Sequence, residues 1–273
     1  MPACRRRPSL LAAAAAVALA ALAALAAPTA ALAATAAASP RRALASTPRE
    51  CLCLFDVDRT LTSMQGAKSS TCPGDQVFST VPDPAYLPSG ASPGPFTASE
   101  FALNIRNSFC GQKCHLGVIS AGKMSGGGGA VDPEHGLITG LLSKSNGNAK
   151  MPAASKLSWA KFGSSTLAPF IWGTPATSKY QAVPTIQKYY AQFGAKIDDD
   201  QVFFFDDIAE NVKPWGSTRY HAHQIACDKR AADPTGKHHA GDPSKYLGLC
   251  GATVNEVNGH AFKKTCSLCN GAC

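Results

Sequence analysis

Short apolar runs recur between residues 51 and 227, and most of them are bounded by polar residues. They read CLCLF at 51–55, HLGVIS at 115–120, APFIW at 168–172, VFFF at 202–205 and HAHQIAC at 221–227. Runs of this length are typical of buried strands, although periodicity alone does not distinguish a strand from a buried helix segment. We predict strands at these places, with HAHQIAC as the last of them.

Helical patterns lie between these runs. The phrase TASE places Thr97 as an N-cap and Glu100 three residues later, which predicts a capping box. Apolar residues then recur every four positions, at Phe101, Ile105 and Phe109, along one helix face. Residues 182–193 have helical apolar spacing, followed by Gly194 as a stop signal. Alternating strands and helices predict an α/β fold: a Rossmann-like parallel sheet with helices on both faces.

Two segments interrupt this alternation. Residues 63–96 contain six Pro and four Gly and are expected to be loop, either a flap over a site or a disulfide-tied insertion. Residues 121–165 are expected to form a second insertion of small elements. The GGGG at 126–129 has no following Gly-Lys-Ser/Thr, so we interpret it as a loop and not as a phosphate-binding motif. We therefore expect a catalytic domain over 41–227 and a Cys-rich extension over 228–273 packed on it.

The first forty residues have the pattern of a targeting segment. Three arginines precede an apolar run, Leu10–Ala27, and Ala31-Leu32-Ala33 offers a small-residue cleavage site. A secreted protein is the favoured interpretation. A transit peptide to an organelle lumen and an uncleaved membrane anchor are the alternatives. No later segment has the length and apolarity of a membrane span.

Charge adds little to this picture. Loss of Arg5, Arg6 and Arg7 with the leader lowers the formal net charge from +8 to +5, and no run of five basic residues is present. The chain shows no nucleic-acid motif. We therefore expect no nucleic-acid partner and, after leader cleavage, no membrane partner.

Cysteine usage supports an oxidising compartment. Eleven cysteines are present, and loss of Cys4 leaves an even number, which favours disulfides in a secreted chain. Cys51 and Cys53 would point to the same face of the first strand. A zinc site is the competing interpretation of the C-terminal tail; its ligands would be His260, Cys266, Cys269 and Cys273. The histidines are otherwise expected at the surface or in loops; they are His221, His223, His238, His239 and His260.

Oxygen-bearing side chains stand at three strand ends. Asp56 and Asp58 follow the first run, Ser120 ends the second, and Asp206 and Asp207 follow VFFF. Parallel strands bring their carboxyl ends to one edge of a sheet, where α/β proteins bind ligands. Carboxylates crowded there oppose one another's ionisation unless a cation is present. Mg²⁺ fits best, because it uses a few carboxylates together with phosphate oxygens.

These residues resemble the motifs of the haloacid dehalogenase-like superfamily, especially its phosphatases. DVDRTLT at 56–62 is similar to the first motif, DxDxT, with Arg59 where the family commonly has Gly. GVIS ending in Ser120 is similar to the second motif, and FFFDD followed by Asn211 is similar to the fourth. The third motif is a lysine with little context. Lys179 is the first choice because it opens the helix before the Asp206 strand; Lys156 and then Lys123 are the alternatives.

The resemblance implies a Mg²⁺-dependent phosphomonoester hydrolase that acts on a small-molecule or protein substrate. Asp56 would be the nucleophile that forms an aspartyl phosphate, and Asp58 would be the acid and base. Ser120, Lys179 and Thr60 are the expected phosphate-binding residues. The expected metal site comprises Asp56, Asp58 through its backbone carbonyl, Asp206 and Asp207. Alternatives are a phosphotransferase or mutase of the same superfamily and an inactive Cys-rich secreted binding protein.

Overall fold

The structure, a computed structural model, describes residues 49–67, 70–83, 85, 92–122, 133–228, 230–231 and 247–273. The predicted leader, Lys123, the glycine run at 126–129, His238 and His239 lie outside these residues.

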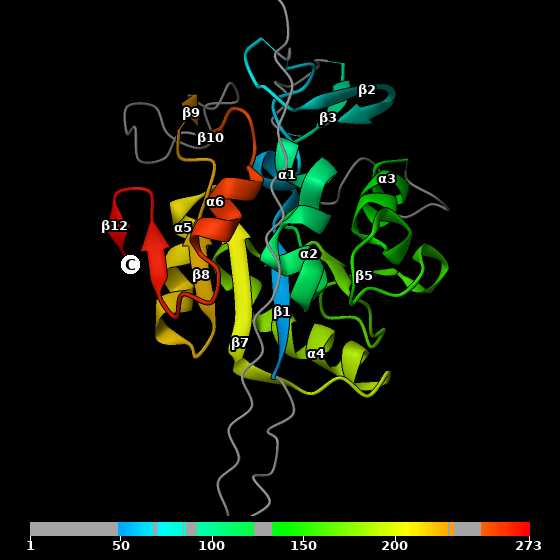
Figure 1. Ribbon diagram of the computed structural model, residues 1–273, viewed down its shortest axis with the longest axis vertical. Coiled ribbons are helices and arrows are strands. Elements are labelled where there is room, and N and C mark those ends of the chain that lie inside the picture. The colour runs from blue at the N-terminus through cyan, green and yellow to red at the C-terminus, as the bar shows by residue number, and fades with distance from the viewer. Residues whose placement is uncertain are drawn as a thin grey trace, which may run out of the picture. The chain divides into compact units, whose positions relative to one another are not determined.

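An eight-stranded sheet in the order β12-β11-β8-β7-β1-β4-β6-β5 forms the centre of the fold (Figure 1). Its strands are β1 (Glu50–Phe55), β4 (Cys114–Ile119), β5 (Trp159–Lys161), β6 (Phe170–Trp172), β7 (Ile197–Asp206), β8 (His221–Gln224), β11 (Cys266–Leu268) and β12 (Gly271–Ala272). Every neighbouring pair is parallel except β11 and β12. The predicted α/β class with a mostly parallel sheet is confirmed.

Helices cover both faces of this sheet. They are α1 (Glu100–Asn104), α2 (Phe109–Lys113), α3 (Pro133–Leu142), α4 (Val183–Ala191), α5 (Ala209–Val212) and α6 (Val254–Gly259). On one face the Phe55 ring lies 5.1 Å from the ring of Phe101 in α1. On the other face a side chain at Gly117 would collide with Leu54 and approach Ile186 of α4. A glycine at this position therefore lets α4 pack closely on the sheet.

The strand β1 is the buried centre of the core. All five residues of its CLCLF run are at most 3% exposed. Strands buried on both faces are continuously apolar, as here, because helices exclude water from each side. The strands predicted at HLGVIS, APFIW and VFFF are also present, and β7 begins at Ile197, five residues before its apolar run.

The predicted helix starting at Thr97 is broken and begins later. Thr97 lies in a strand, and the N-cap of α1 is Ser99, whose side chain accepts a hydrogen bond from the Ala102 amide. Ser108 then caps a new helix, α2, so the buried stripe is divided among short segments. The expected capping box was wrong because the chain stays extended through Ala98. The helix predicted at 182–193 is present as α4, with Gly194 at a φ of +85° after it.

The described part of the Pro-rich segment 63–96 contains strands where a loop was expected. Part of it forms an antiparallel hairpin of β2 (Gln76–Asp83) and β3 (Gly94–Ala98). Pro82 stands opposite Pro95, which a two-stranded sheet tolerates because outward positions need no amide donor. The hairpin is joined to the fold by the Cys72–Cys250 disulfide and lies beyond the carboxyl ends of β1 and β7 (Figure 1).

The C-terminal segment contributes further strands, so HAHQIAC is not the last strand. The short strands β9 (Arg230–Ala231) and β10 (Leu247–Gly248) pair with each other. β11 then adds to the main sheet beside β8, and β12 turns back on it. Sequence-based reasoning missed β11 because CSL is too short to give a period.

Ten cysteines form five disulfides: Cys51–Cys114, Cys53–Cys110, Cys72–Cys250, Cys227–Cys269 and Cys266–Cys273. The predicted disulfides are confirmed, and the zinc interpretation of the tail is wrong because its cysteine sulfurs are bonded to other sulfurs. Disulfides in this number suggest an extracellular or secreted protein. Among the described helices, none has the length and apolarity needed to span a bilayer.

Candidate active site

The order of the central strands brings the predicted residues to one place. β1 lies between β7 and β4, with Phe55 level with Phe205 on one side and Val118 on the other. The Asp56 amide continues this ladder and donates to the Phe205 carbonyl at 2.9 Å. The chain leaves β1 toward β4 on one side and returns as β7 on the other, so a crevice opens between them.

Lys179 bridges two of the predicted carboxylates. Its Nζ lies 2.7 Å from Oδ1 of Asp56 and 2.7 Å from Oδ2 of Asp206. The lysine belongs to the 3₁₀ segment Ala176–Ala182 that leads into α4, and its side chain is 1% exposed. Its Nζ also lies 5.7 Å from the centre of the Phe204 ring. A charged group so deeply buried requires such partners.

Asp206 is held by the start of the helix that follows it. Its Oδ1 accepts from the Ile208 amide at 2.8 Å, and the Asn211 amide group donates to Oδ1 and Oδ2 at 3.0 and 3.1 Å. Asn211 lies in α5, directly after the strand end. The arrangement fixes the orientation of the Asp206 carboxylate before any ligand binds.

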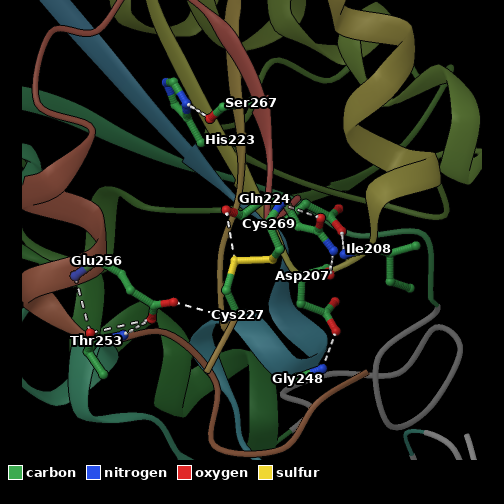
Figure 2. The surroundings of a disulfide bond; sticks show 11 residues. Asp207, Ile208, His223, Gln224, Cys227, Gly248, Thr253, Glu256, Ser267 and Cys269 are labelled. Atoms are coloured by element: carbon green, nitrogen blue, oxygen red, sulfur yellow. Dashed lines mark hydrogen bonds between the residues drawn. A yellow bond between two sulfur atoms is a disulfide. The ribbon is translucent and has the colours of Figure 1, made fainter. Parts of the chain in front are cut away.

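Asp207 points toward the C-terminal segment (Figure 2). Its Oδ2 accepts from the Gly248 amide at 2.8 Å, and its carbonyl accepts from the side chain of Gln224 at 2.8 Å. The Gln224 side chain accepts in turn from the Cys269 amide at 3.0 Å, beside the Cys227–Cys269 disulfide. The disulfide therefore supports the strand end from outside the pocket.

The turn after Asp56 is unusual in its backbone. Val57–Leu61 forms one wide turn, closed by a hydrogen bond from the Thr62 amide to the Val57 carbonyl at 3.0 Å. Arg59 has a φ of +63°, a conformation that favours glycine and costs another residue about 1 kcal/mol or more. The Thr62 hydroxyl accepts from the Arg59 amide at 3.0 Å and stabilises it.

Burial and neighbouring charges shift the pKa values of side chains in the site. Burial raises the pKa of Asp56 well above its ordinary value; Lys179 opposes this rise, and Asp206 adds to it. Burial likewise raises the pKa of Asp58, while Lys179 and Arg59 oppose the rise. For Lys179 burial opposes the charge, but Asp206 and Asp56 outweigh it and raise the pKa above the ordinary value. A carboxyl with a raised pKa holds its proton over a wider pH range, which suits a group that must donate it.

A pocket of about 460 Å³ opens at these groups. Its described lining residues are Asp56, Asp58, Ala121, Gly122, Ala176, Thr177, Lys179, Ile208, Glu210 and Asn211. Two expected phosphate ligands are not among them. Ser120 is buried and its hydroxyl accepts from the Gly122 amide at 3.2 Å, whereas Thr60 is buried and its carbonyl accepts from Ser99 and Ala252. Lys156 is exposed, and its only described hydrogen bonds involve its backbone.

The carboxyl groups could hold a metal ion. One oxygen from each of Asp56, Asp206 and Asp207 lies within 4.8 Å of the other two, and all three residues are buried. An all-oxygen set suits a hard cation such as Mg²⁺ or Ca²⁺. The carboxyl group of Asp58, whose expected metal contact is its backbone carbonyl, belongs to a different set with Asp83 of β2 and Glu134 of α3.

Several site residues carried little sequence signal. Glu210 lines the pocket, and its place beside Asn211 in DDIAENV, close to the acidic pair, is the one feature of the sequence that could have indicated it. Asp83 and Glu134 lie in the two insertions, where no motif marks them. Their approach to Asp58 depends on tertiary structure alone.

The histidines differ from the expectation of surface or loop positions. His221 and His223 are buried in β8, and the His223 and His260 rings stack at 4.3 Å. The expectation was wrong for these two residues because they face the core beside Phe203 and Phe205.

The site therefore combines three buried carboxylates, one buried lysine and a further aspartate at the carboxyl ends of neighbouring strands. Comparisons with protein-family models, with curated protein sequences and with solved structures found no match.

Proposed function

We propose that the protein is a Mg²⁺-dependent phosphomonoester hydrolase of the haloacid dehalogenase-like superfamily. The observation that carries this proposal is the Lys179 bridge between Asp56 and Asp206, in a pocket that Asp58 also lines. A lysine between two carboxylates supplies positive charge where a phosphoryl group must bind. The motif order along the chain adds independent support.

In the first step, Asp56 attacks phosphorus through a carboxylate oxygen. An oxygen–phosphorus bond forms to Asp56 while the ester oxygen–phosphorus bond breaks. Asp58 donates its proton to the departing oxygen, so the leaving group departs as an alcohol. The raised pKa of Asp58 favours this role, because it extends the pH range over which the carboxyl holds a proton that it can donate.

In the second step, water attacks the aspartyl phosphate. Asp58, now a carboxylate, accepts a proton from that water, inorganic phosphate leaves, and the Asp56 carboxylate is restored. Lys179 stabilises charge on the phosphoryl oxygens in both steps, and Ser120 supports the strand end beside them. Atoms and charge balance because the proton that Asp58 gives is regained from water.

Mg²⁺ fits the carboxylate set, because buried carboxyl oxygens of Asp56, Asp206 and Asp207 lie within 4.8 Å of one another. The ion would be held by Asp56, by Asp206 and by the backbone carbonyl of Asp58, with Asp207 beside them. When bound, it supplies positive charge to the phosphoryl oxygens.

We also propose that the mature chain is secreted after removal of the leader. The five disulfides support this location, because they persist in oxidising compartments.

Phosphate release from 4-nitrophenyl phosphate, with and without Mg²⁺, tests the activity. Asp56→Asn should abolish turnover and form no phosphoenzyme. Asp58→Asn should slow turnover by about 10²- to 10⁴-fold. It should also accumulate phosphoenzyme, because nitrophenolate leaves unaided whereas water attack lacks its base. Rapid quench and intact-mass measurement would show one added phosphoryl group on the Asp58 variant.

The control variant is Asp198→Asn, an exposed change near the opposite end of β7, and it should match the wild-type rate. Phosphoryl transfer to an added alcohol in preference to water would indicate a phosphotransferase instead. Absence of both phosphate release and phosphoenzyme would contradict the proposal and favour an inactive binding protein.

A further inference from the structure

The charges of the pocket are unevenly distributed. Lys179 is the one basic side chain among its described lining residues, and both of its close partners are carboxylates. Glu210 is the one described charged residue of the lining that the proposed mechanism does not use. Among the described lining residues, the charge that a substrate meets beyond its phosphoryl group is therefore negative.

Glu210 is poorly neutralised within the protein. It lies in α5, and its side chain is 35% exposed. Its Oε1 is 3.9 Å from Nζ of Lys213, an exposed lysine one turn later, which is the limit of an ion pair. Its Oε2 is buried and accepts no hydrogen bond from the described part of the chain. A carboxylate in this state retains much of its field inside the pocket.

The surroundings of Asp58 are acidic as well. Carboxyl oxygens of Asp58, Asp83 and Glu134 lie within 4.8 Å of one another, and Asp83 and Glu134 are each 1% exposed. The charge of Lys179 acts on Asp58, and the charge of Arg59 acts on both Asp58 and Asp83. These carboxyls lie on the side of Asp58, which is where the leaving group must lie if Asp58 protonates it.

We infer that the natural substrate is a phosphate monoester whose leaving group carries a positive charge, such as the phosphate of an amino alcohol. The inference rests on the proposed function and names its substrate class. An ammonium group attached to the ester oxygen's carbon chain lies near Glu210 and the acidic neighbours of Asp58 while the phosphoryl group lies at Lys179. A second anionic group on the substrate is repelled from the same place.

Three esters of matched size isolate the effect of charge. They are 2-aminoethyl phosphate, 2-hydroxyethyl phosphate and carboxymethyl phosphate, whose leaving groups are cationic, neutral and anionic. One charge changed at about 6 Å in a partly hydrated pocket alters binding on the order of tenfold. At pH 7 with Mg²⁺, kcat/KM of the wild type should therefore fall about tenfold at each step along this series.

Variants at position 210 assign the effect. Glu210→Gln keeps the shape of the side chain and should reduce the preference for the aminoethyl over the carboxymethyl ester by up to about 100-fold, because the two leaving groups differ by two unit charges. Glu210→Lys should favour the carboxymethyl ester. Asp198→Asn removes the same charge far from the pocket and should keep the wild-type preference.

The two proposals fail in different ways. Equal kcat/KM for the three esters, or the highest value for the carboxymethyl ester, would overturn the substrate class and leave the phosphatase proposal intact. A wild-type preference that Glu210→Gln and Glu210→Lys leave unchanged would also overturn it. Hydrolysis of none of these esters, nor of 4-nitrophenyl phosphate, would contradict the proposed function itself.

Discussion

Lys179 forms one ion pair with Asp56 of the DVD motif and one with Asp206 of the FFFDD motif. Its ammonium group lies between Asp56 and Asp206, and both carboxylates have little access to water. A buried ion pair contributes little net stability, whereas a buried charge left alone is costly. The lysine therefore stabilises a carboxylate pair that the fold does not otherwise tolerate.

Lys179→Met should destabilise the protein by about 3–5 kcal/mol at pH 7, because two buried carboxylates lose their shared cation. The loss should be smaller at pH 5, where protonation of the carboxyl groups relieves their repulsion. Urea unfolding at both pH values, in the absence of Mg²⁺, measures it. Lys156→Met is the matched control, since Lys156 is exposed and should leave the midpoint unchanged. An equal loss at both pH values would contradict an electrostatic cause.

Individual residues could be placed from the sequence where a polar side chain directly follows an apolar strand or precedes the next one. Asp56, Asp206 and Lys179 were expected at strand ends or beside them, and the structure brings them into contact. Asp83 and Glu134 could not be anticipated, because their positions depend on how two insertions fold over Asp58. Arg59 at positive φ could not be anticipated either, since the sequence alone suggested a tolerated departure from glycine.

Among the elements, β1 is tied to the strand β4 and to the helix α2 by two nested disulfides. Cys51–Cys114 closes a separation of 63 residues and Cys53–Cys110 one of 57, so they restrict nearly the same loop. A loop of about 60 residues loses roughly 4 kcal/mol of unfolded-state entropy when it is closed once. Closing it a second time restricts only the short segments between the two bridges.

Replacing both Cys53 and Cys110 with Ala should therefore cost much less than the roughly 4 kcal/mol of a single closed loop. Replacing all four cysteines should cost more than the sum of the two separate double variants. Urea unfolding of the three variants gives these free energies. Additive losses would show that each bridge acts through local packing and not through the shared loop.

Short elements were the hardest to predict. The apolar stripe of Phe101, Ile105 and Phe109 is buried as expected, but two serine caps divide it into separate helical turns. The hairpin β2–β3 was hidden by prolines that a two-stranded sheet tolerates. Long apolar runs, by contrast, indicated their strands directly because burial on both faces leaves no polar position.

At the scale of the whole molecule, the C-terminal segment completes the core. β11 extends the sheet beyond β8, and His260 at the end of α6 stacks on His223. Burial, followed by the charges of His260 and His221, lowers the pKa of His223 to about 3. The ring shares a hydrogen bond with Ser267 of β11 at 2.8 Å. The neutral form of His223 is therefore part of the contact between the segment and the sheet.

Stability should fall in acid because of this histidine. Its pKa lies near 6.5 in the unfolded chain and near 3 in the folded protein, so the unfolded state binds more protons between these values. From pH 6.5 to pH 5 the group should cost roughly 2 kcal/mol of unfolding free energy. Urea unfolding of wild type and His223→Gln measures the difference. The variant should lose less unfolding free energy than the wild type over this range. Above pH 7.5 the unfolding free energies of the two proteins should change with pH in parallel.

The pairing of the cysteines has a consequence for synthesis of the chain. None of the five bonds joins cysteines that are adjacent in sequence order, and Cys72 is 178 residues from its partner. Cysteines that emerge early from a ribosome meet only wrong partners, with Cys51, Cys53 and Cys72 available before any of their native partners. Bonds formed then must be broken and exchanged, which takes seconds to hours without a catalyst. Recombinant yield should therefore depend on a disulfide isomerase more than on the strength of the oxidant.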